Sequence, residues 1–375
     1  MKIKKHFFIL PLLIILLNCG STKKATSVGG LKTSAYIAFD DNRLQYEGRI
    51  GMSRSGAAAL YWSGSIVRIR FEGTRLKALL KDYNGQNYFN VILDGKVIQK
   101  LNIDSAKKWY LLAENLASGP HIIELFKRTQ FNAEYNRRYT RFYGFQLDNG
   151  RLLSPPETKK RKMEFYGNSI TCGHAIEDSS GSDSGAAIVE NNYLSYAALT
   201  ARHFHAGYSC VAVSGIGLIS GFRKAIMPEV YDLLNPADST DKWNFDKYTP
   251  NIVVVNLLEN DEAVIGRPES EPFKRRFGSQ VPTEAFIIDA YARFISKLRA
   301  HYPVASIICV LGDMGITRPG SKWPEYVKQA TAQLHDEKVY TYFFSYKGTP
   351  GHPQIKEQQM MAESLIQFVD QHNMW

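Results

Sequence analysis

The spacing of hydrophobic and polar residues changes near the middle of the chain. Between about residue 38 and residue 153, apolar residues come in short stretches, and in SIVRIRFEG (65–73) they partly alternate with charged residues. Such alternation predicts strands with one buried face. Asp94-Gly95 separates two stretches within 88–103 and is a good hairpin signal. Strands at this spacing with few helical stretches predict an all-β sandwich. Further expected strands are 75–83, 119–129 and 140–148.

A different pattern begins after Ser154-Pro155-Pro156. Expected strands become continuous apolar runs, and segments with helical periodicity separate them. Strands buried on both faces and alternating with helices predict a parallel sheet covered by helices on both sides. We therefore expect a β-sandwich domain over 36–155 and an α/β domain over 156–375. The expected strands are 163–166, 210–215, 251–258, 306–313 and 338–344, and the expected helices are 193–204, 282–302, 323–336 and 355–372.

The N-terminal segment has the features of an export signal. Three lysines precede the apolar run 7–17, and Asn18 and Cys19 follow it. The run is too short for a comfortable transmembrane helix. The stretch LLNC resembles a bacterial lipoprotein signal, which implies that Cys19 becomes the lipidated first residue; a plain signal peptide cut nearby remains the alternative. We expect a signal peptide over 1–18, a polar tether over 19–35, and a lipid anchor in the bacterial cell envelope, in the periplasm or on the cell surface.

Composition and charge narrow the function classes. Hydrophobic residues make up 44% of the 375 and charged residues 22%, as in globular proteins. The formal charge of +10 is spread along the chain and accompanies no nucleic-acid-binding motif, so we expect no nucleic-acid partner. Cys172, Cys210 and Cys309 match no zinc spacing, and we expect neither metal nor cofactor. Buried free thiols are expected, with a Cys172–Cys210 bridge left open.

Polar residues follow the expected parallel strands where each strand ends. Ser169, Gly215 and Asn260 do so, and His352 precedes the last helix. The carboxyl ends of parallel strands share one edge of a sheet, where sites collect. There a serine can attack a carbonyl while a neutral histidine takes its proton. Backbone N–H groups at Ser169 and Gly215, together with the Asn260 amide, can donate to the oxyanion that forms. The pattern predicts acyl transfer.

These residues resemble the four blocks of the SGNH (GDSL-type) hydrolases. The matching blocks are GNSIT at 167–171, Gly215, Asn260 in NLLENDE, and His352 in GHP, in that order. Longer stretches, among them FKRTQ, FYGFQLDNGRLLSPP and ENNYLSYAALTAR, are similar to carbohydrate esterase family 2, including acetylxylan esterases. That resemblance implies a jelly-roll sandwich followed by a three-layer, flavodoxin-like SGNH domain. It also implies a serine esterase that removes O-acetyl groups from plant cell-wall xylan, mannan or glucomannan.

Three positions depart from the family pattern. Asn168 replaces the usual aspartate of the nucleophile block but still suits a turn, and Leu258-Glu259 replaces Gly-Thr, where larger side chains could narrow the pocket or move Asn260. Thr349 stands where many SGNH enzymes have the aspartate three residues before the histidine. The resemblance implies a Ser–His dyad whose ring is oriented by a backbone carbonyl, with Thr349 as a candidate helper. Asp313 is interpreted as a strand-end turn residue rather than as the missing acid, and His174 as a loop residue.

Two other functions compete with the esterase. The first is a carbohydrate-binding surface lipoprotein with a catalytically impaired esterase domain, and the departures at Leu258, Glu259 and Thr349 support it. Against it, the sequence retains all four residues that catalysis needs: Ser169, Gly215, Asn260 and His352. The second is a lipid-acting GDSL lipase, and the presence of the N-terminal β-sandwich domain argues against this hypothesis. The expected partners are an acetylated polysaccharide or oligosaccharide, and a membrane through Cys19.

Overall fold

The computed structural model describes residues 34–53, 56–132 and 137–375. These residues belong to one compact unit. The expected signal peptide, Cys19 and most of the expected tether lie outside the described residues. Within the described ranges, no helix is both long enough and apolar enough to cross a membrane.

The first part of the described chain is the predicted antiparallel sandwich, made of two six-stranded sheets. One sheet has the order β3-β4-β11-β6-β9 with β1 beside β11, and the other has the order β12-β5-β10-β7-β8 with β2 beside β5. Ser34 and Ala35, which the sequence assigned to the tether, already belong to β1. The strands are β1 Ser34–Ala38, β2 Gln45–Glu47, β3 Ile50–Ser53, β4 Ala57–Leu60, β5 Ile66–Glu72, β6 Arg75–Asp82, β7 Asn87–Leu93, β8 Lys96–Ile103, β9 Lys108–Glu114, β10 Pro120–Lys127, β11 Thr140–Asp148 and β12 Arg151–Leu152.

The sandwich core forms because buried apolar residues alternate with more exposed residues along the strands. In β6, Leu76, Ala78 and Leu80 are buried, while the residues between them are more exposed. Asp94 and Gly95 join β7 to β8 with φ angles of 49° and 82°, the left-handed conformation that a tight hairpin turn requires. The strand pattern and the predicted hairpin are thus confirmed.

The second part contains one parallel sheet in the order β14-β13-β15-β16-β17. Numbered within this sheet, the order is 2-1-3-4-5, which is the flavodoxin-like arrangement, and the order reverses between β13 and β15. The strand expected at 210–215 begins earlier, because Gly207 already pairs with Lys162 of β13. The strands are β13 Lys162–Gly167, β14 Gly207–Ala212, β15 Ile252–Asn256, β16 Ser306–Leu311 and β17 Val339–Phe343.

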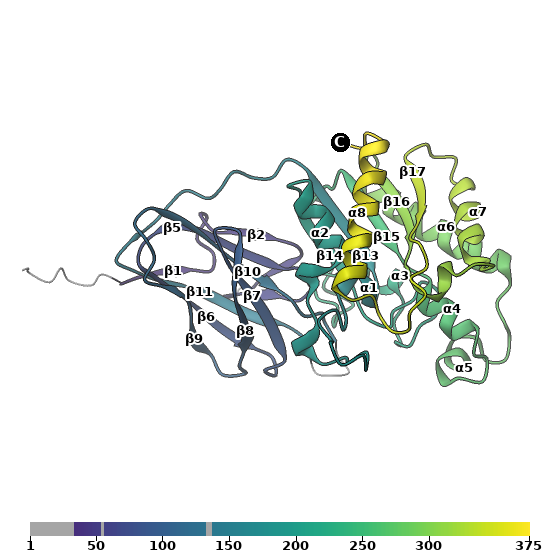
Figure 1. Ribbon diagram of the computed structural model, residues 1–375, viewed down its shortest axis with the longest axis horizontal. Helices are drawn as coiled ribbons and strands as arrows, with labels where there is room; N and C mark the ends of the chain where they lie inside the picture. The colour runs from purple at the N-terminus through teal and green to yellow at the C-terminus, as the bar shows by residue number, and fades with distance from the viewer. Residues whose placement is uncertain (1–33, 54–55, 133–136) are drawn as a thin grey trace, which may run out of the picture. The chain divides into compact units, whose positions relative to one another are not determined.

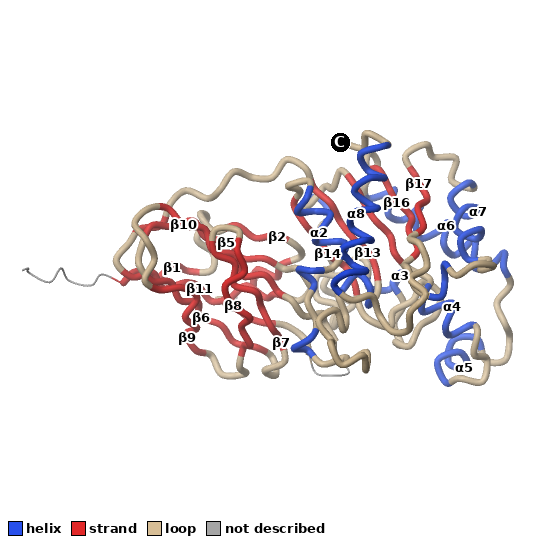
Figure 2. Tube along the Cα trace, viewed as in Figure 1, coloured by secondary structure: helices blue, strands red, loops and turns tan. Residues whose placement is uncertain are grey.

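Helices cover both faces of this sheet, as Figures 1 and 2 show. Val253 and Val255 of β15 belong to a hydrophobic cluster with residues of α6 and α7. Ile252 and Val254 belong to a second cluster with residues of α2 and α8. Successive residues of one strand therefore enter opposite layers, and the three-layer prediction is confirmed. The helices are α1 Ser169–Cys172, α2 Tyr196–His203, α3 Met227–Val230, α4 Glu259–Ile265, α5 Glu271–Phe277, α6 Glu284–His301, α7 Trp323–Ala332 and α8 Ile355–Gln371.

A buried ion pair joins the sandwich to the parallel sheet. Arg49, 1% exposed, precedes β3 and donates to Glu164 of β13 at 3.2 Å and to the Tyr166 hydroxyl at 2.9 Å. It also donates to the Tyr231 carbonyl oxygen at 2.6 Å. Trp62 of the sandwich packs in the cluster shared with α6 and α7. A buried charge is tolerated only with close partners, and the partners of Arg49 lie in the α/β part of the chain. Burial of this arginine therefore depends on the presence of both halves.

Candidate active site

The nucleophile turn lies between β13 and α1. A Cβ atom at Gly167 would lie 2.1 Å from the Thr171 hydroxyl oxygen, so only glycine fits there. The Asn168 side-chain oxygen accepts the Ile170 N–H at 3.1 Å and caps α1. Ser169 is the first residue of this helix, where a backbone N–H has no acceptor within the helix. Gly167 and Asn168 thus fix the turn that places Ser169 just after β13.

His352 lies between Ser169 and an aspartate. Its Nε2 atom is 2.7 Å from the Ser169 Oγ atom. Its Nδ1 atom is 2.8 Å from Oδ2 of Asp183, and its backbone N–H donates to Oδ1 of Asp183 at 3.0 Å. The hydrogen bonds from His352 lower the pKa of Asp183 to about 2, although partial burial opposes the shift. An ionised carboxylate at Nδ1 holds the ring in the tautomer whose Nε2 accepts a proton.

This arrangement corrects the expected orientation of the histidine. The sequence proposed a backbone carbonyl or Thr349, but the Thr349 hydroxyl oxygen accepts from the Lys347 ammonium at 2.8 Å. The same ammonium donates to the backbone oxygens of Thr349 and Pro350. Asp183 takes the position at the ring although it comes from the loop between α1 and α2, far from His352 in the chain. Asp313 is buried at the end of β16, and burial raises its pKa to about 6.

A second aspartate shapes the loop that carries Asp183. The Asp178 carboxylate accepts the N–H groups of Ser180 at 3.0 Å and Ser184 at 2.7 Å. Gln354, two residues after His352, donates to the Asp178 carbonyl oxygen at 2.6 Å. Asp183 itself has a φ of 57°, a left-handed conformation that aspartate tolerates better than most residues. The one signal in the sequence is the polar turn-forming run DSSGSDSG.

The predicted oxyanion residues lie at neighbouring strand ends. The Asn260 amide donates to the Ile216 carbonyl oxygen at 2.7 Å, so Asn260 contacts the loop that holds Gly215. A primary amide has two N–H groups, and this hydrogen bond uses one of them. Asp261, fully buried, accepts three backbone N–H groups of the same loop at 2.6–2.9 Å. Both residues of the Asn-Asp pair thus hold the glycine loop.

Leu258 does not obstruct the site. Its φ of 89° explains the glycine that the family usually has there, and a leucine in this conformation costs roughly 1–2 kcal/mol. Its side chain is fully buried in the hydrophobic cluster with α6 and α7. The concern that a larger residue at this position narrows the pocket therefore does not apply to Leu258.

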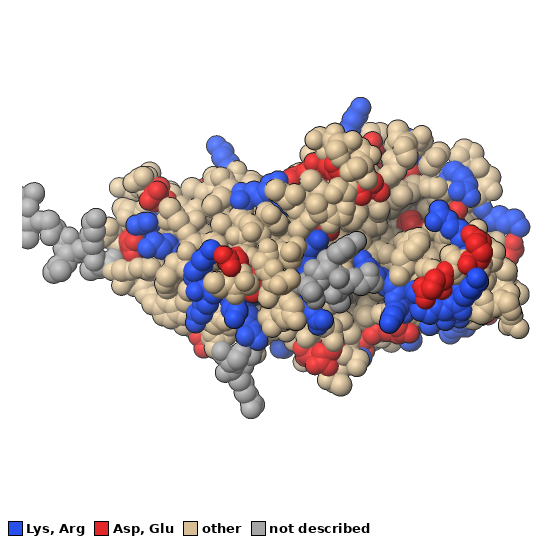
Figure 3. All heavy atoms as spheres, turned by 90° about the horizontal axis from the view of Figure 1, so that it is seen from below, with Lys and Arg blue, Asp and Glu red and all other residues tan. Residues whose placement is uncertain are grey.

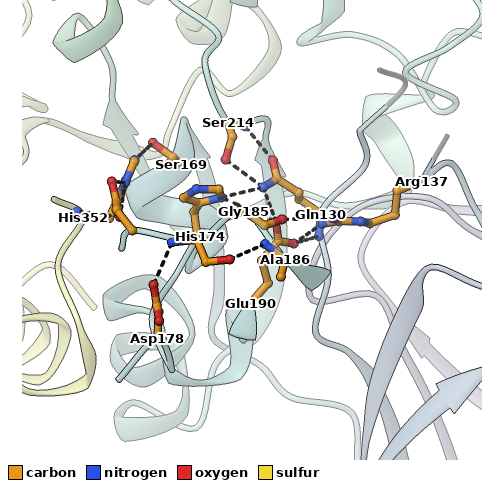
Figure 4. Close-up of polar contacts among 12 residues, drawn as sticks. Gln130, Arg137, Ser169, His174, Asp178, Gly185, Ala186, Glu190, Ser214 and His352 are labelled. Carbon is orange, nitrogen blue, oxygen red and sulfur yellow. Dashed lines mark hydrogen bonds and ion pairs between the residues drawn. The ribbon is translucent and has the colours of Figure 1, made fainter. Parts of the chain in front are cut away.

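Gln130, from the sandwich part of the chain, contacts the loop after β14 that carries Ser214 and Gly215, called here the oxyanion loop (Figure 4). The Gln130 side-chain oxygen accepts the Ser214 N–H at 2.7 Å, and its amide donates to the Ser214 hydroxyl at 2.7 Å. The same amide donates to Glu190 at 2.8 Å, and Glu190 pairs with Arg137. The His174 ring lies between this group and the site, with its centroid 4.6 Å from that of the His352 ring. Sequence reasoning missed Gln130 as a site residue and treated His174 as a loop residue.

Replacing Gln130 by alanine should lower kcat roughly tenfold to a hundredfold and change KM little. Ser214 would lose both of its hydrogen bonds to Gln130 and keep the one from Arg223 to its carbonyl oxygen, so the adjacent Gly215 N–H would be less well fixed. Loss of one oxyanion donor costs about 10²–10³-fold. Steady-state kinetics on a small acetate ester measures the split. Gln333→Ala, at an exposed position, is the matched control. An unchanged kcat in Gln130→Ala would show that the oxyanion loop keeps its shape without the hydrogen bonds from Gln130.

Surface charge is mixed on the face seen in Figure 3. Lysine and arginine side chains gather there toward the helical end, beside aspartates and glutamates. In α5, Arg275 pairs with Glu271, and Arg276 lies 3.8 Å from Glu229. The positive residues of α5 are therefore partly neutralised locally. No cluster of three or more His, Cys, Asp or Glu residues that could hold a metal occurs in the described ranges.

The flavodoxin-like sheet and the placement of Ser169, Gly215, Asn260 and His352 at its carboxyl edge define an SGNH hydrolase fold. Residues 46–156 match the family described as carbohydrate esterase 2 N-terminal. The chain is 31% identical to a family two carbohydrate esterase from Clostridium thermocellum solved in complex with cellohexaose; the match covers 88% of this chain and 100% of that chain, with a TM-score of 0.78. The chain belongs to carbohydrate esterase family 2, as its sequence predicted.

Two curated relatives cover most of this chain. Cellulase/esterase CelE of Acetivibrio thermocellus is 33% identical over 338 residues, which are 87% of this chain and 39% of that protein. The chain therefore spans well under half the length of CelE. An acetylxylan esterase / glucomannan deacetylase of Cellvibrio japonicus is 25% identical, and the match covers 90% of this chain and 91% of the relative.

Proposed function

We propose that this protein is a serine esterase that removes O-acetyl groups from plant cell-wall polysaccharides. The observation that carries the proposal is the continuous line of hydrogen bonds from Ser169 through His352 to Asp183. A serine hydroxyl is a weak nucleophile until a neighbouring base takes its proton, and this geometry supplies that base.

The reaction follows from the geometry in two halves. His352 Nε2 takes the Ser169 proton while Oγ attacks the acetyl carbonyl carbon. The resulting oxyanion is stabilised by the N–H groups of Ser169 and Gly215 and by the Asn260 amide, each contributing roughly 3–4 kcal/mol in the transition state. The imidazolium, stabilised by Asp183, returns the proton to the sugar oxygen as the C–O bond breaks. Water, deprotonated by His352, then attacks the acetyl carbonyl carbon; His352 returns this proton to Oγ as the acyl C–O bond breaks, which releases acetate and regenerates Ser169.

The substrate class rests on the relatives. The Clostridium esterase was solved with a cellohexaose chain, and the Cellvibrio relative is named for xylan and glucomannan. Acetylated xylan, mannan and glucomannan are therefore the substrates we propose for this chain.

Acetate release by the purified chain tests the proposal. Acetylated xylan, acetylated glucomannan and a chromogenic acetate ester should all be hydrolysed. Absence of acetate from all three would overturn the proposal, and polysaccharide binding without release would establish the impaired, carbohydrate-binding alternative. A strong preference for long-chain esters would instead indicate a lipase.

We further propose that Cys19 carries a lipid anchor in the cell envelope. The lipoprotein-like stretch LLNC supports it, and Cys19 lies outside the described residues. Cys19→Ser should accumulate as an uncleaved, unlipidated precursor, measured by mass spectrometry of the N-terminal peptide. A mature N-terminus at another residue, without lipid, would contradict the proposal.

A further inference from the structure

Two departures from the family pattern, far apart in sequence, are in direct contact. The Asn168 side-chain amide donates to Oε2 of Glu259 at 2.6 Å. The other oxygen of Glu259 accepts the Gly312 N–H at 2.6 Å. Asn168 follows β13, Glu259 begins α4 shortly after β15, and Gly312 follows β16. One carboxylate therefore ties together the ends of three neighbouring strands.

The chemistry of the contact is a reversal of the family arrangement. The family pattern has a carboxylate at position 168 and a hydroxyl at position 259. Here the carboxylate is at position 259 and position 168 carries an amide, so the hydrogen bond runs from 168 to 259. Each departure alone would leave a mismatch: two carboxylates facing each other, or a short hydroxyl opposite an amide. Together they form a matched donor and acceptor.

The surroundings of the Glu259 carboxylate are shaped for it. A Cβ atom at Gly312 would lie 2.9 Å from Oε1 of Glu259 and 2.4 Å from the Ile170 side chain. A side chain at 312 would therefore displace Ile170 and push against the Glu259 carboxylate. Burial raises the pKa of Glu259 to about 7, and the hydrogen bonds from the Gly312 N–H and the Asn168 amide oppose this rise. Glu259 contacts the histidine nowhere in the described structure, so it is not a catalytic acid.

We infer that Glu259 is a positioning residue of the active site, which fixes the nucleophile turn through Asn168, and that the two departures are a compensating pair. This inference rests on the esterase function proposed above. Asn168 directly precedes Ser169, and Glu259 directly precedes Asn260. One hydrogen bond thus sets the nucleophile against the oxyanion amide, and small misplacements at such a centre cost large factors in rate.

A double-mutant cycle tests the inference. Asn168→Asp alone places two carboxylates in contact and should lower kcat about a hundredfold or more, and Glu259→Thr alone should lower it at least about tenfold. The double variant restores the family arrangement and should recover to within about tenfold of the wild type, with KM little changed throughout. Glu262→Thr, one turn further along α4 and paired with Arg318, is the matched control.

Two further readouts keep the outcome clear. The rate of Ser169 labelling by a fluorophosphonate should follow the same pattern, and it needs no sugar substrate. The free energies of unfolding should show the same coupling, which separates failure of this inference from failure of the esterase proposal. If a single variant does not fold, Glu259→Gln keeps the shape but has one acceptor oxygen for two donors, the Asn168 amide and the Gly312 N–H, and it should lower kcat in a folded protein. Independent, multiplying effects of the two substitutions in folded variants would overturn the pairing.

Discussion

Replacing Ser169 by alanine should lower acetate release by roughly 10⁴-fold or more while leaving the protein folded. The substitution removes only the oxygen that would form the acetyl-enzyme. Ser169 is 6% exposed and its Oγ atom contacts His352, so its loss leaves no large cavity. Acetate release from acetylated xylan measures the effect, and circular dichroism reports the fold.

Covalent labelling gives an independent check on the same residue. A fluorophosphonate should label the wild type and not Ser169→Ala. Ser279→Ala, at an exposed position on the surface, should behave like the wild type in both assays. A loss of only a few-fold in Ser169→Ala would show that another group is the nucleophile.

Asp183→Asn should lower kcat by about 10³–10⁴-fold. The new amide would donate to Nδ1 of His352, forcing the ring proton onto Nε2, where it blocks proton transfer from Ser169. Thr349→Val and Asp313→Asn are the matched controls, and each should change the rate by about tenfold at most, because Asp183 is the residue hydrogen-bonded to Nδ1 of His352. Steady-state kinetics on one ester compares all three variants. A thousandfold loss in Asp313→Asn with a nearly silent Asp183→Asn would assign the acid to Asp313 instead.

The low pKa of Asp183 also sets the expected pH behaviour. Because the hydrogen bonds from His352 lower it from 3.8 to about 2, the carboxylate stays ionised through mild acid. The stability that Asp183 contributes is present above pH 3.8 and is lost as the pH falls toward 2. Activity lost in mildly acidic solution is therefore not due to Asp183.

Hydrophobic periodicity was enough to predict both halves of the fold. It failed for β9 (Lys108–Glu114), whose burial does not alternate strictly along the strand. It also failed for the one- or two-turn helices α3 to α5, which are too brief for a period to stand out. The strand-end residues Ser169, Gly215 and Asn260 could be located because a parallel sheet brings its carboxyl ends to one edge.

The positions of the remaining site residues depend on the conformations of loops, and hydrophobic periodicity carries no information about these conformations. Asp183 reaches His352 through a loop whose shape comes from side-chain hydrogen bonds to Asp178. Gln130 enters from the sandwich, and its partner Ser214 is 84 residues away in the chain. Thr349 occupies the family's usual position for the acid, three residues before His352, whereas this chain supplies the acid, Asp183, from another loop.

The ion pair between Arg49 and Glu164 has a consequence for how such a protein can change over generations. The two residues are 115 positions apart, so the sandwich is synthesised with its arginine unmatched until β13 has followed. Burying an uncompensated guanidinium is costly, so we expect this edge of the sandwich to finish folding only when the parallel sheet is present. Swapping the N-terminal module for one from an unrelated enzyme would remove this charge and the Gln130 amide at once. We therefore expect the two halves to be inherited together and to diversify through substitutions and loop changes rather than by recombination of modules.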